Sequence, residues 1–147
     1  MFKRILVTTD GSELSAKAVD KAIALARAVG AELLALKVVH LQSESHWDGA
    51  LIREHAEHAK LEAQQTELAQ AIVDAVKASA QSAGVQATPL TVKSGSVADA
   101  VIEAAQKNAC DLIVMASHGR RGLARVLLGS ETQHVLTHSQ IPVLVIR

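Results

Sequence analysis

The chain has 147 residues, of which 49% are hydrophobic, and its 15 Lys and Arg residues balance its 15 Asp and Glu residues. This length suffices for one domain with a substantial core, and a net charge near zero argues against a general nucleic-acid or membrane-surface role. The longest apolar runs, of about five residues, are far shorter than a membrane span. The first residues enter a strand pattern, so we expect no signal peptide.

The single cysteine, Cys110, excludes an intrachain disulfide and fits a reducing, cytoplasmic location. Because cysteine is among the most often buried residue types, we interpret Cys110 as a small core residue. Only Phe2 and Trp47 are aromatic, so the core must be built from Val, Leu, Ile and Ala.

The first forty residues predict a strand, a helix and a second strand. Residues 3–9 form an apolar strand, and Ser12 is placed to cap the N-terminus of a helix that ends near Gly30. Residues 32–39 are again apolar. A unit of this kind is expected to be parallel and right-handed.

The middle of the chain predicts a loop at residues 40–50 and then a long helix rich in Ala, Gln and Glu that ends at Gly84. Its first half, residues 53–60, is charged, and forms either the exposed end of this helix or a separate short one. Residues 85–93 read as a third strand, in which Pro89 indicates an edge position. The apolar stripe expected on the long helix consists of Leu61, Leu68, Ile72 and Val76.

The last third of the chain predicts two more helices and two more strands. Ser96 with Asp99 resembles a helix start, and residues 111–116 form a fourth strand. Ser130 with Gln133 reads as a capping box for a helix over residues 131–139. Residues 141–146 form a fifth strand. Alternating strands and helices predict an α/β fold in one domain, residues 1–147: a doubly wound, Rossmann-like five-stranded parallel sheet with helices on both faces.

A ligand site is expected past the carboxyl ends of the strands, where such sheets bind ligands. Residues 8–10, 38–40 and 116–122 should meet there. The last of these segments supplies small residues, exposed amides and two arginines. The helix start after Gly129 adds free N–H groups and a partial positive charge, which suit an anion such as phosphate.

The residues alone leave a simple tight turn as an equally good interpretation. Neither the Gly-x4-Gly-Lys-Ser/Thr loop nor the Gly-x-Gly-x-x-Gly pattern is present. Ser117 does not lie on a Gly-x-Ser-x-Gly elbow, so a dedicated hydrolase is disfavoured and we assign no catalytic residue. The histidine pairs 55/58 and 134/138 lack further ligands at metal-binding spacing, so we assign no metal-ligating residue.

The stretch Met-Ala-Ser-His-Gly-Arg-Arg-Gly-Leu-Ala-Arg-Val-Leu-Leu-Gly-Ser-Glu-Thr, residues 115–132, resembles the signature of the universal stress protein family. The N-terminal Ile-Leu-Val-Thr-Thr-Asp-Gly-Ser and the ending Ile-Pro-Val-Leu-Val-Ile resemble the same family. The resemblance covers the whole chain in order and implies an ATP-binding member of that family.

The resemblance implies a motif of Gly, two residues, Gly, nine residues and Gly-Ser or Gly-Thr. Gly119 is then the second glycine and Gly129-Ser130 the final pair, while Ala116 replaces the first glycine. If position 116 required a positive φ, the methyl would cost roughly 1–2 kcal/mol, whereas at an ordinary strand end it would cost little. The resemblance further implies that Asp10 lies near the ribose and that the Val38 backbone meets the adenine edge.

The resemblance implies a cytoplasmic protein of the stress response or signalling that binds ATP or AMP, with Mg²⁺ accompanying the nucleotide. Its expected partners are a second copy bound through the apolar edge strand 141–147 and an unidentified protein, and neither nucleic acid nor membrane. The alternatives are a dimeric interaction module without nucleotide and a slow ATP-hydrolysing enzyme. The expected nucleotide-binding residues are Thr8, Thr9, Asp10, Val38, Ala116, Ser117, His118, Gly119, Arg120, Gly122, Gly129, Ser130, Glu131 and Thr132.

Overall fold

The computed structural model describes residues 1–41, 51–119 and 127–147, without the side chains of residues 51–53. Strands and helices alternate along the chain as predicted. They are β1 (Arg4–Thr8), α1 (Glu13–Val29), β2 (Glu32–His40), α2 (Leu51–Ser82), β3 (Ala87–Ser94), α3 (Val97–Lys107), β4 (Leu112–Ala116), α4 (Ser130–His138) and β5 (Val143–Ile146).

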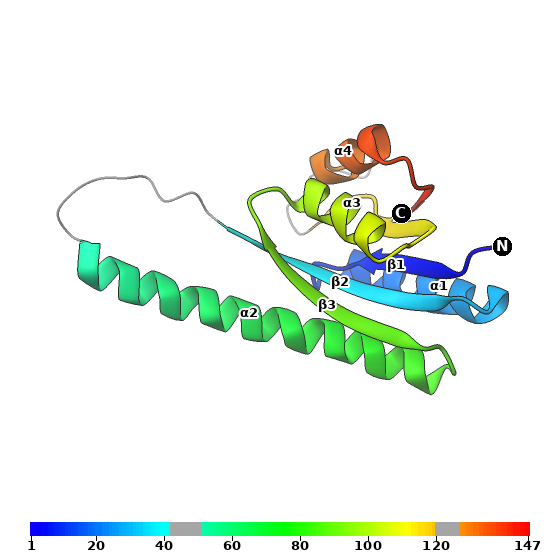
Figure 1. Cartoon of the computed structure of the whole chain (residues 1–147), viewed down its shortest axis with the longest axis horizontal. Helices are drawn as coiled ribbons and strands as arrows, with labels where there is room; N and C mark the ends of the chain where they lie inside the picture. The colour runs from blue at the N-terminus through cyan, green and yellow to red at the C-terminus, as the bar shows by residue number, and fades with distance from the viewer. Residues whose placement is uncertain (42–50, 120–126) are drawn as a thin grey trace.

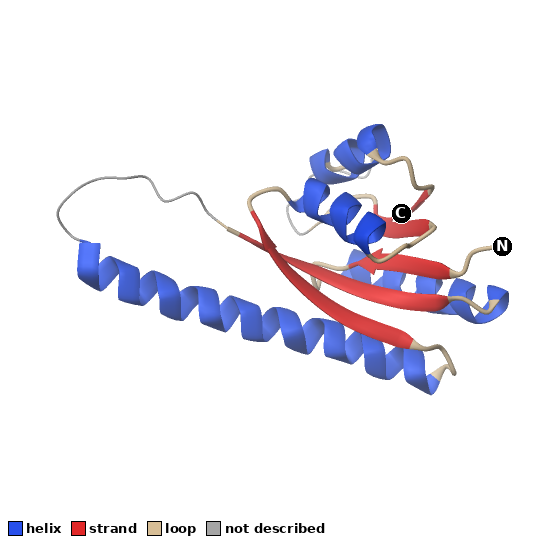
Figure 2. Ribbon diagram, in the orientation of Figure 1, coloured by secondary structure: helices blue, strands red, loops and turns tan. Residues whose placement is uncertain are grey.

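The five strands form one parallel sheet in the order β3-β2-β1-β4-β5, with β1 at its centre (Figure 1). Helices α1 and α2 cover one face, and α3 and α4 cover the other (Figure 2). This arrangement confirms the predicted doubly wound α/β class. It also confirms the edge position of Pro89, which lies on the outer strand β3. Within the described ranges, no helix is long and apolar enough to cross a membrane.

The core consists of two aliphatic layers, one on each face of the sheet. Successive residues of β1 alternate between them: Ile5 and Val7 pack toward α1 and α2, whereas Leu6 packs toward α3. Cys110 belongs to the second layer and is only 6% exposed. Burial raises the pKa of its thiol to about 11, so it stays protonated at neutral pH, as expected of a core residue.

Three predicted helix-capping signals are present, and a fourth is wrong. Ser12 and Ser96 accept from the backbone N–H groups of Ser15 and Asp99, and Gly30 closes α1 with φ 70°. Helix α4, however, is capped by Gly129 without a side-chain hydrogen bond. The predicted capping box fails because Gly129, one residue earlier, is the cap: its carbonyl accepts from Gln133 N–H at 3.0 Å, and the Gln133 side chain donates to the Leu128 carbonyl.

Helix α2 decides between two alternatives and corrects one expectation. It is continuous over 32 residues, so its charged first half is the exposed end of one helix and not a separate one. Its buried residues, spaced by three or four, are Ala69, Val73, Val76 and Ala80. Two leucines of the predicted stripe, Leu61 and Leu68, are 53% and 65% exposed. Leu68 directly precedes the buried Ala69, so it lies on the side of α2 that faces away from the core.

Two strand boundaries also shift. Strand β3 begins at Ala87 and β5 at Val143. Pro142 has no N–H to give to a ladder, and it contributes only its carbonyl, which accepts from Ile113 N–H at 2.9 Å. Of the predicted loop at residues 40–50, residue 40 ends β2, and residues 42–50 lie outside the described part of the chain.

Helix α2 offers a matched pair of substitutions that tests this packing. Val73→Ala should lower the free energy of unfolding by about 1–3 kcal/mol, because it leaves a cavity beneath the sheet. Leu68→Ala removes more atoms from an exposed position and should change it by less than about 0.5 kcal/mol. Urea denaturation followed by circular dichroism measures both. An effect at Leu68 as large as that at Val73 would show that the exposed stripe is covered in solution.

Candidate functional site

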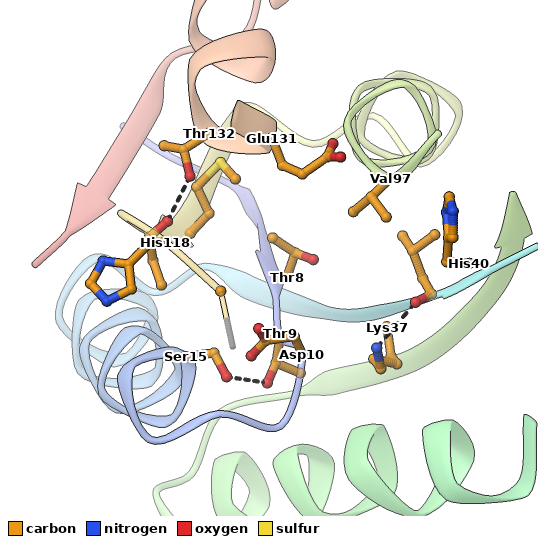
Figure 3. A pocket seen from close by; sticks show the side chains of 14 residues that line it. Thr8, Thr9, Asp10, Ser15, Lys37, His40, Val97, His118, Glu131 and Thr132 are labelled. Carbon is orange, nitrogen blue, oxygen red and sulfur yellow. Dashed lines mark hydrogen bonds between the residues drawn. The ribbon is translucent and has the colours of Figure 1, made fainter. Parts of the chain in front are cut away.

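A pocket of about 260 Å³ opens at the carboxyl ends of β1, β2 and β4 (Figure 3). This is where the connections from the central strands diverge, so no crossover helix covers the strand ends. The pocket is lined by Thr8, Thr9, Asp10, Ser15, Lys37, Val38, His40, Val97, Met115, Ala116, His118, Gly119, Glu131 and Thr132.

Most of the predicted site residues line this pocket. The base of the loop and the start of the helix beside the pocket are formed instead by Ser117, Gly129 and Ser130. Two further predicted residues, Arg120 and Gly122, lie outside the described residues. The predicted set omits Ser15, Lys37, His40, Val97 and Met115. His40 could have been included, because it belongs to a segment expected at the crevice. The others are brought to the pocket by the packing of α1, α3 and the sheet, and no local sequence signal marks them.

The turn after β1 is held by a directed chain of hydrogen bonds. The hydroxyl of Ser15 donates to the Ser12 carbonyl at 2.9 Å, so the 2.9 Å contact between Thr9 Oγ1 and Ser15 Oγ must have Thr9 as donor. Thr9 Oγ1 in turn accepts from Gly11 N–H at 3.2 Å. These bonds hold the turn that carries Asp10 against the start of α1.

Asp10 points one carboxylate oxygen back into its own turn and the other across the pocket. Its Oδ1 accepts from Ser12 N–H at 2.8 Å. A Cβ placed on Gly119 would lie 2.7 Å from Asp10 Oδ2. Because that separation is shorter than a normal contact, only a glycine at 119 leaves the carboxylate where it is.

The backbone of Val38 faces the pocket because β2 is longer than β1. In β2, the N–H groups of Glu32 and Leu33 bond to opposite neighbours, so even-numbered residues face β1 and odd-numbered ones face β3. The last bond to β1 runs from Thr9 N–H to Leu36 O at 3.0 Å. The next even-numbered residue, whose N–H and C=O would face β1 if that strand continued, is Val38. Among the described residues no backbone bond continues this ladder, and Val38 N–H and C=O point into the space beyond β1.

Lys37 adds a cation at this edge. Its Nζ donates to the Val38 carbonyl oxygen at 3.1 Å, as Figure 3 shows. The strand edge therefore offers one acceptor, the Val38 oxygen, and two kinds of donor, the Val38 N–H and the Lys37 ammonium.

On the opposite side of the pocket, the loop between β4 and α4 is closed at its base. Gly129 N–H donates to the Ser117 carbonyl at 2.7 Å, and the Thr132 hydroxyl donates to the Ala116 carbonyl at 2.9 Å. These bonds bring the start of α4 against the end of β4. The first turn of α4, with its partial positive charge, therefore lies at the pocket.

Ala116 occupies an ordinary strand position. It pairs with Ile146 in β5, and the one non-glycine residue with positive φ among those described is Ala109. Position 116 therefore does not have the left-handed backbone that would make the methyl group of Ala116 costly.

Glu131, one of the predicted ligand contacts, is engaged elsewhere. Its Oε2 accepts from Ala98 N–H at 2.8 Å, in the first turn of α3. Nearby, His134 Nε2 lies 2.9 Å from Asp99 Oδ1, and hydrogen bonds from Ser96 and then from His134 lower the pKa of Asp99. These contacts join α4 to α3, and the Glu131 carboxylate holds the pocket wall together.

Comparisons with known proteins match this sequence and its fold over the whole chain. The model of the universal stress protein family matches residues 1–147. Universal stress protein YxiE of Bacillus subtilis is 34% identical, and the match covers all of both chains. The solved structure of MJ0577, from Methanocaldococcus jannaschii, has a TM-score of 0.79 at 28% identity, covering 99% of this chain and 96% of that one. A universal stress protein solved in complex with cAMP has a TM-score of 0.71 at 26% identity, covering 99% and 97%.

Two glycines provide a matched test of the loop base. A Cβ on Gly129 would lie 3.2 Å from His118 Cα and 3.3 Å from the Ser117 oxygen, whereas one on Gly95 would meet nothing within 4 Å. Gly129→Ala should therefore lower the free energy of unfolding by about 1–3 kcal/mol, and Gly95→Ala should leave it nearly unchanged. Thermal and urea unfolding of both variants give the comparison. Equal stabilities would mean that the loop base yields without cost.

Proposed function

The chain belongs to the universal stress protein family, and from this premise we propose that it binds an adenine nucleotide, ATP, in the pocket at the ends of β1, β2 and β4. One observation carries the proposal: the N–H and C=O of Val38 point into the pocket without a partner strand. One donor and one acceptor, side by side on a backbone, complement the N1 acceptor and the 6-amino donor of adenine.

The rest of the pocket suits the sugar and the phosphates. Asp10 presents a carboxylate oxygen toward the pocket side of Gly119, where it would accept from ribose hydroxyls. Gly119 has no side chain to obstruct phosphate oxygens, and the start of α4 would supply N–H groups and partial positive charge to them. Arg120 follows directly and is proposed to compensate phosphate charge. Because Ala116 is an unstrained strand residue, the departure from the family motif is compatible with binding.

A nucleotide-associated Mg²⁺ would be held chiefly by phosphate oxygens and water. Within the described ranges, no three His, Cys, Asp or Glu side chains gather closely enough to hold a metal ion. Among the described pocket residues, the Asp10 carboxylate has chemistry suited to such an ion. With the metal bound, the ion would neutralise phosphate charge, and the protein's own task would be to orient base and sugar.

Support for an adenine nucleotide comes also from the relative solved with cAMP. We propose that nucleotide occupancy reports on cellular state during stress, in the cytoplasm, through a protein partner. Hydrolysis is the weaker alternative, since Glu131, the acidic residue that lines the described part of the pocket with Asp10, is hydrogen-bonded to Ala98 N–H.

We further propose that the chain forms a homodimer through β5. This strand is the outermost of the sheet, and its side chains are all only half-buried or exposed, with Leu144 39% exposed. An apolar edge with unpaired backbone groups favours pairing with another strand. A two-fold axis would let β5 meet its own copy antiparallel, giving a closed contact.

Nucleotide binding is tested by calorimetry. ATP with Mg²⁺ should bind with a dissociation constant on the order of micromolar, about −8 kcal/mol. Gly119→Val should remove the signal, because its Cβ would lie 2.7 Å from Asp10 Oδ2. Gly95→Val, which adds the same side chain in open space, should bind as the unsubstituted chain does. If millimolar ATP produced no heat and no thermal shift, the proposal would be refuted and the interaction module without nucleotide would be favoured.

The dimer is tested by sedimentation at micromolar concentrations. Val145→Lys should give monomer or insoluble protein, because it places a charge at the apolar edge. Val145→Thr keeps the β-branched shape and should remain dimeric. The dimer should persist in high salt, since neither apolar contact nor backbone pairing depends on net charge. A monomeric unsubstituted chain would rule the interface out.

A further inference from the structure

We propose that Lys37 sets the base specificity of the pocket and admits 6-oxopurine nucleotides, such as inosine triphosphate, beside adenine nucleotides. This inference rests on the proposed nucleotide site and concerns the part of it that reads the base. The observation behind it is that the Lys37 ammonium lies 3.1 Å from the Val38 oxygen, the acceptor that would meet the purine 6-position.

Adenine and 6-oxopurines present opposite patterns at this edge. Adenine has a 6-amino donor and an N1 acceptor, which match Val38 C=O and N–H. A 6-oxopurine has an O6 acceptor and an N1–H donor. If the Val38 backbone were the only partner, O6 would face the Val38 carbonyl oxygen, and two acceptors cannot form a hydrogen bond. Both oxygens would then be buried without a partner, which strongly disfavours binding of the base.

Lys37 supplies a second donor, beside the Val38 oxygen, where the backbone itself offers only an acceptor. With the base displaced slightly along the edge, the ammonium can donate to O6 while the Val38 oxygen accepts from N1–H. A hydrogen bond to a charged donor is about twice as strong as a neutral one. The side chain of Lys37 is half-buried in the pocket wall, so water competes less for this bond than on an open surface.

Adenine binding is retained in the same arrangement. A carbonyl oxygen has two lone pairs, so the Val38 oxygen can accept from the adenine 6-amino group and from Lys37 together. The ammonium gains nothing from adenine, because both groups are donors. Lys37 therefore contributes to the affinity for 6-oxopurines and little to that for adenine.

The alternative is that Lys37 only stabilises the end of β2 by occupying a strand carbonyl. In that case its removal would change both affinities equally, or would lower the melting temperature without changing their ratio. The ratio of the two affinities therefore separates recognition of the base from support of the fold.

The experiment titrates the full chain with Mg·ATP and Mg·ITP by calorimetry. Inosine is chosen because it has O6 and N1–H but no 2-amino group. Unsubstituted protein should bind ITP within about tenfold of ATP. Lys37→Met should weaken ITP by about tenfold or more, the loss expected for a hydrogen bond to a charged group, and weaken ATP much less, so that the ratio of ITP to ATP affinity falls. Lys37→Arg, which keeps a cationic donor, should restore much of the ITP binding.

Lys93→Met is the matched control. Lys93 lies on β3, pairs with Glu62 at 2.8 Å and does not line the pocket, so its replacement should leave the ratio unchanged. Binding of ATP without ITP by the unsubstituted chain, or equal losses for both in Lys37→Met, would overturn the role of Lys37 while leaving the nucleotide site intact. Failure to bind either nucleotide would overturn the proposed function as well.

Discussion

The site depends on a difference in length between two neighbouring parallel strands. The ladder between β1 and β2 ends with the bond from Thr9 N–H to Leu36 O, while β2 continues to His40. Because β1 is the central strand, its end leaves a notch in the middle of the sheet, where the N–H and C=O of Val38 have no strand beside them. A backbone edge of this kind can read a base without any dedicated side chain.

The opposite wall depends on backbone contacts as well. The carbonyls of Ala116 and Ser117, at the end of β4, accept from Thr132 and Gly129 at the start of α4. The loop between them thus begins and ends at one point. Its base is close-packed, so that a Cβ on Gly129 would lie 3.2 Å from His118 Cα and a Cβ on Gly119 would displace the Asp10 carboxylate. At both positions glycine is favoured by the closeness of neighbouring atoms and not by backbone conformation, since neither glycine has a positive φ.

Polar side chains around the pocket mostly position other parts of the protein. Glu131 holds α4 to the first turn of α3, and Thr9 and Ser15 hold the turn after β1. Asp10 and Lys37 differ, since one presents a carboxylate oxygen across the pocket and the other a cation at its base-reading edge. The chemical identity of the bound base is therefore expected to depend on few side chains, with the backbone supplying the shared part of recognition.

The sequence by itself determined the order of elements and the fold class, because unbroken apolar runs, helical periodicity and caps such as Ser12 and Gly30 are local signals. It also predicted that the segments after β1, β2 and β4 meet, because parallel strands end at one edge of the sheet. Tertiary structure alone decided which face of α2 is buried, since Ala69 and Val73 are covered whereas Leu61 and Leu68, which are equally apolar, are exposed. It decided that Gly129, and not Ser130, caps α4, since the Gly129 carbonyl accepts the first helical bond, from Gln133 N–H. It also placed Lys37 at the pocket. The register between β1 and β2 determines how far β2 extends past the end of β1, and no local sequence pattern encodes that register.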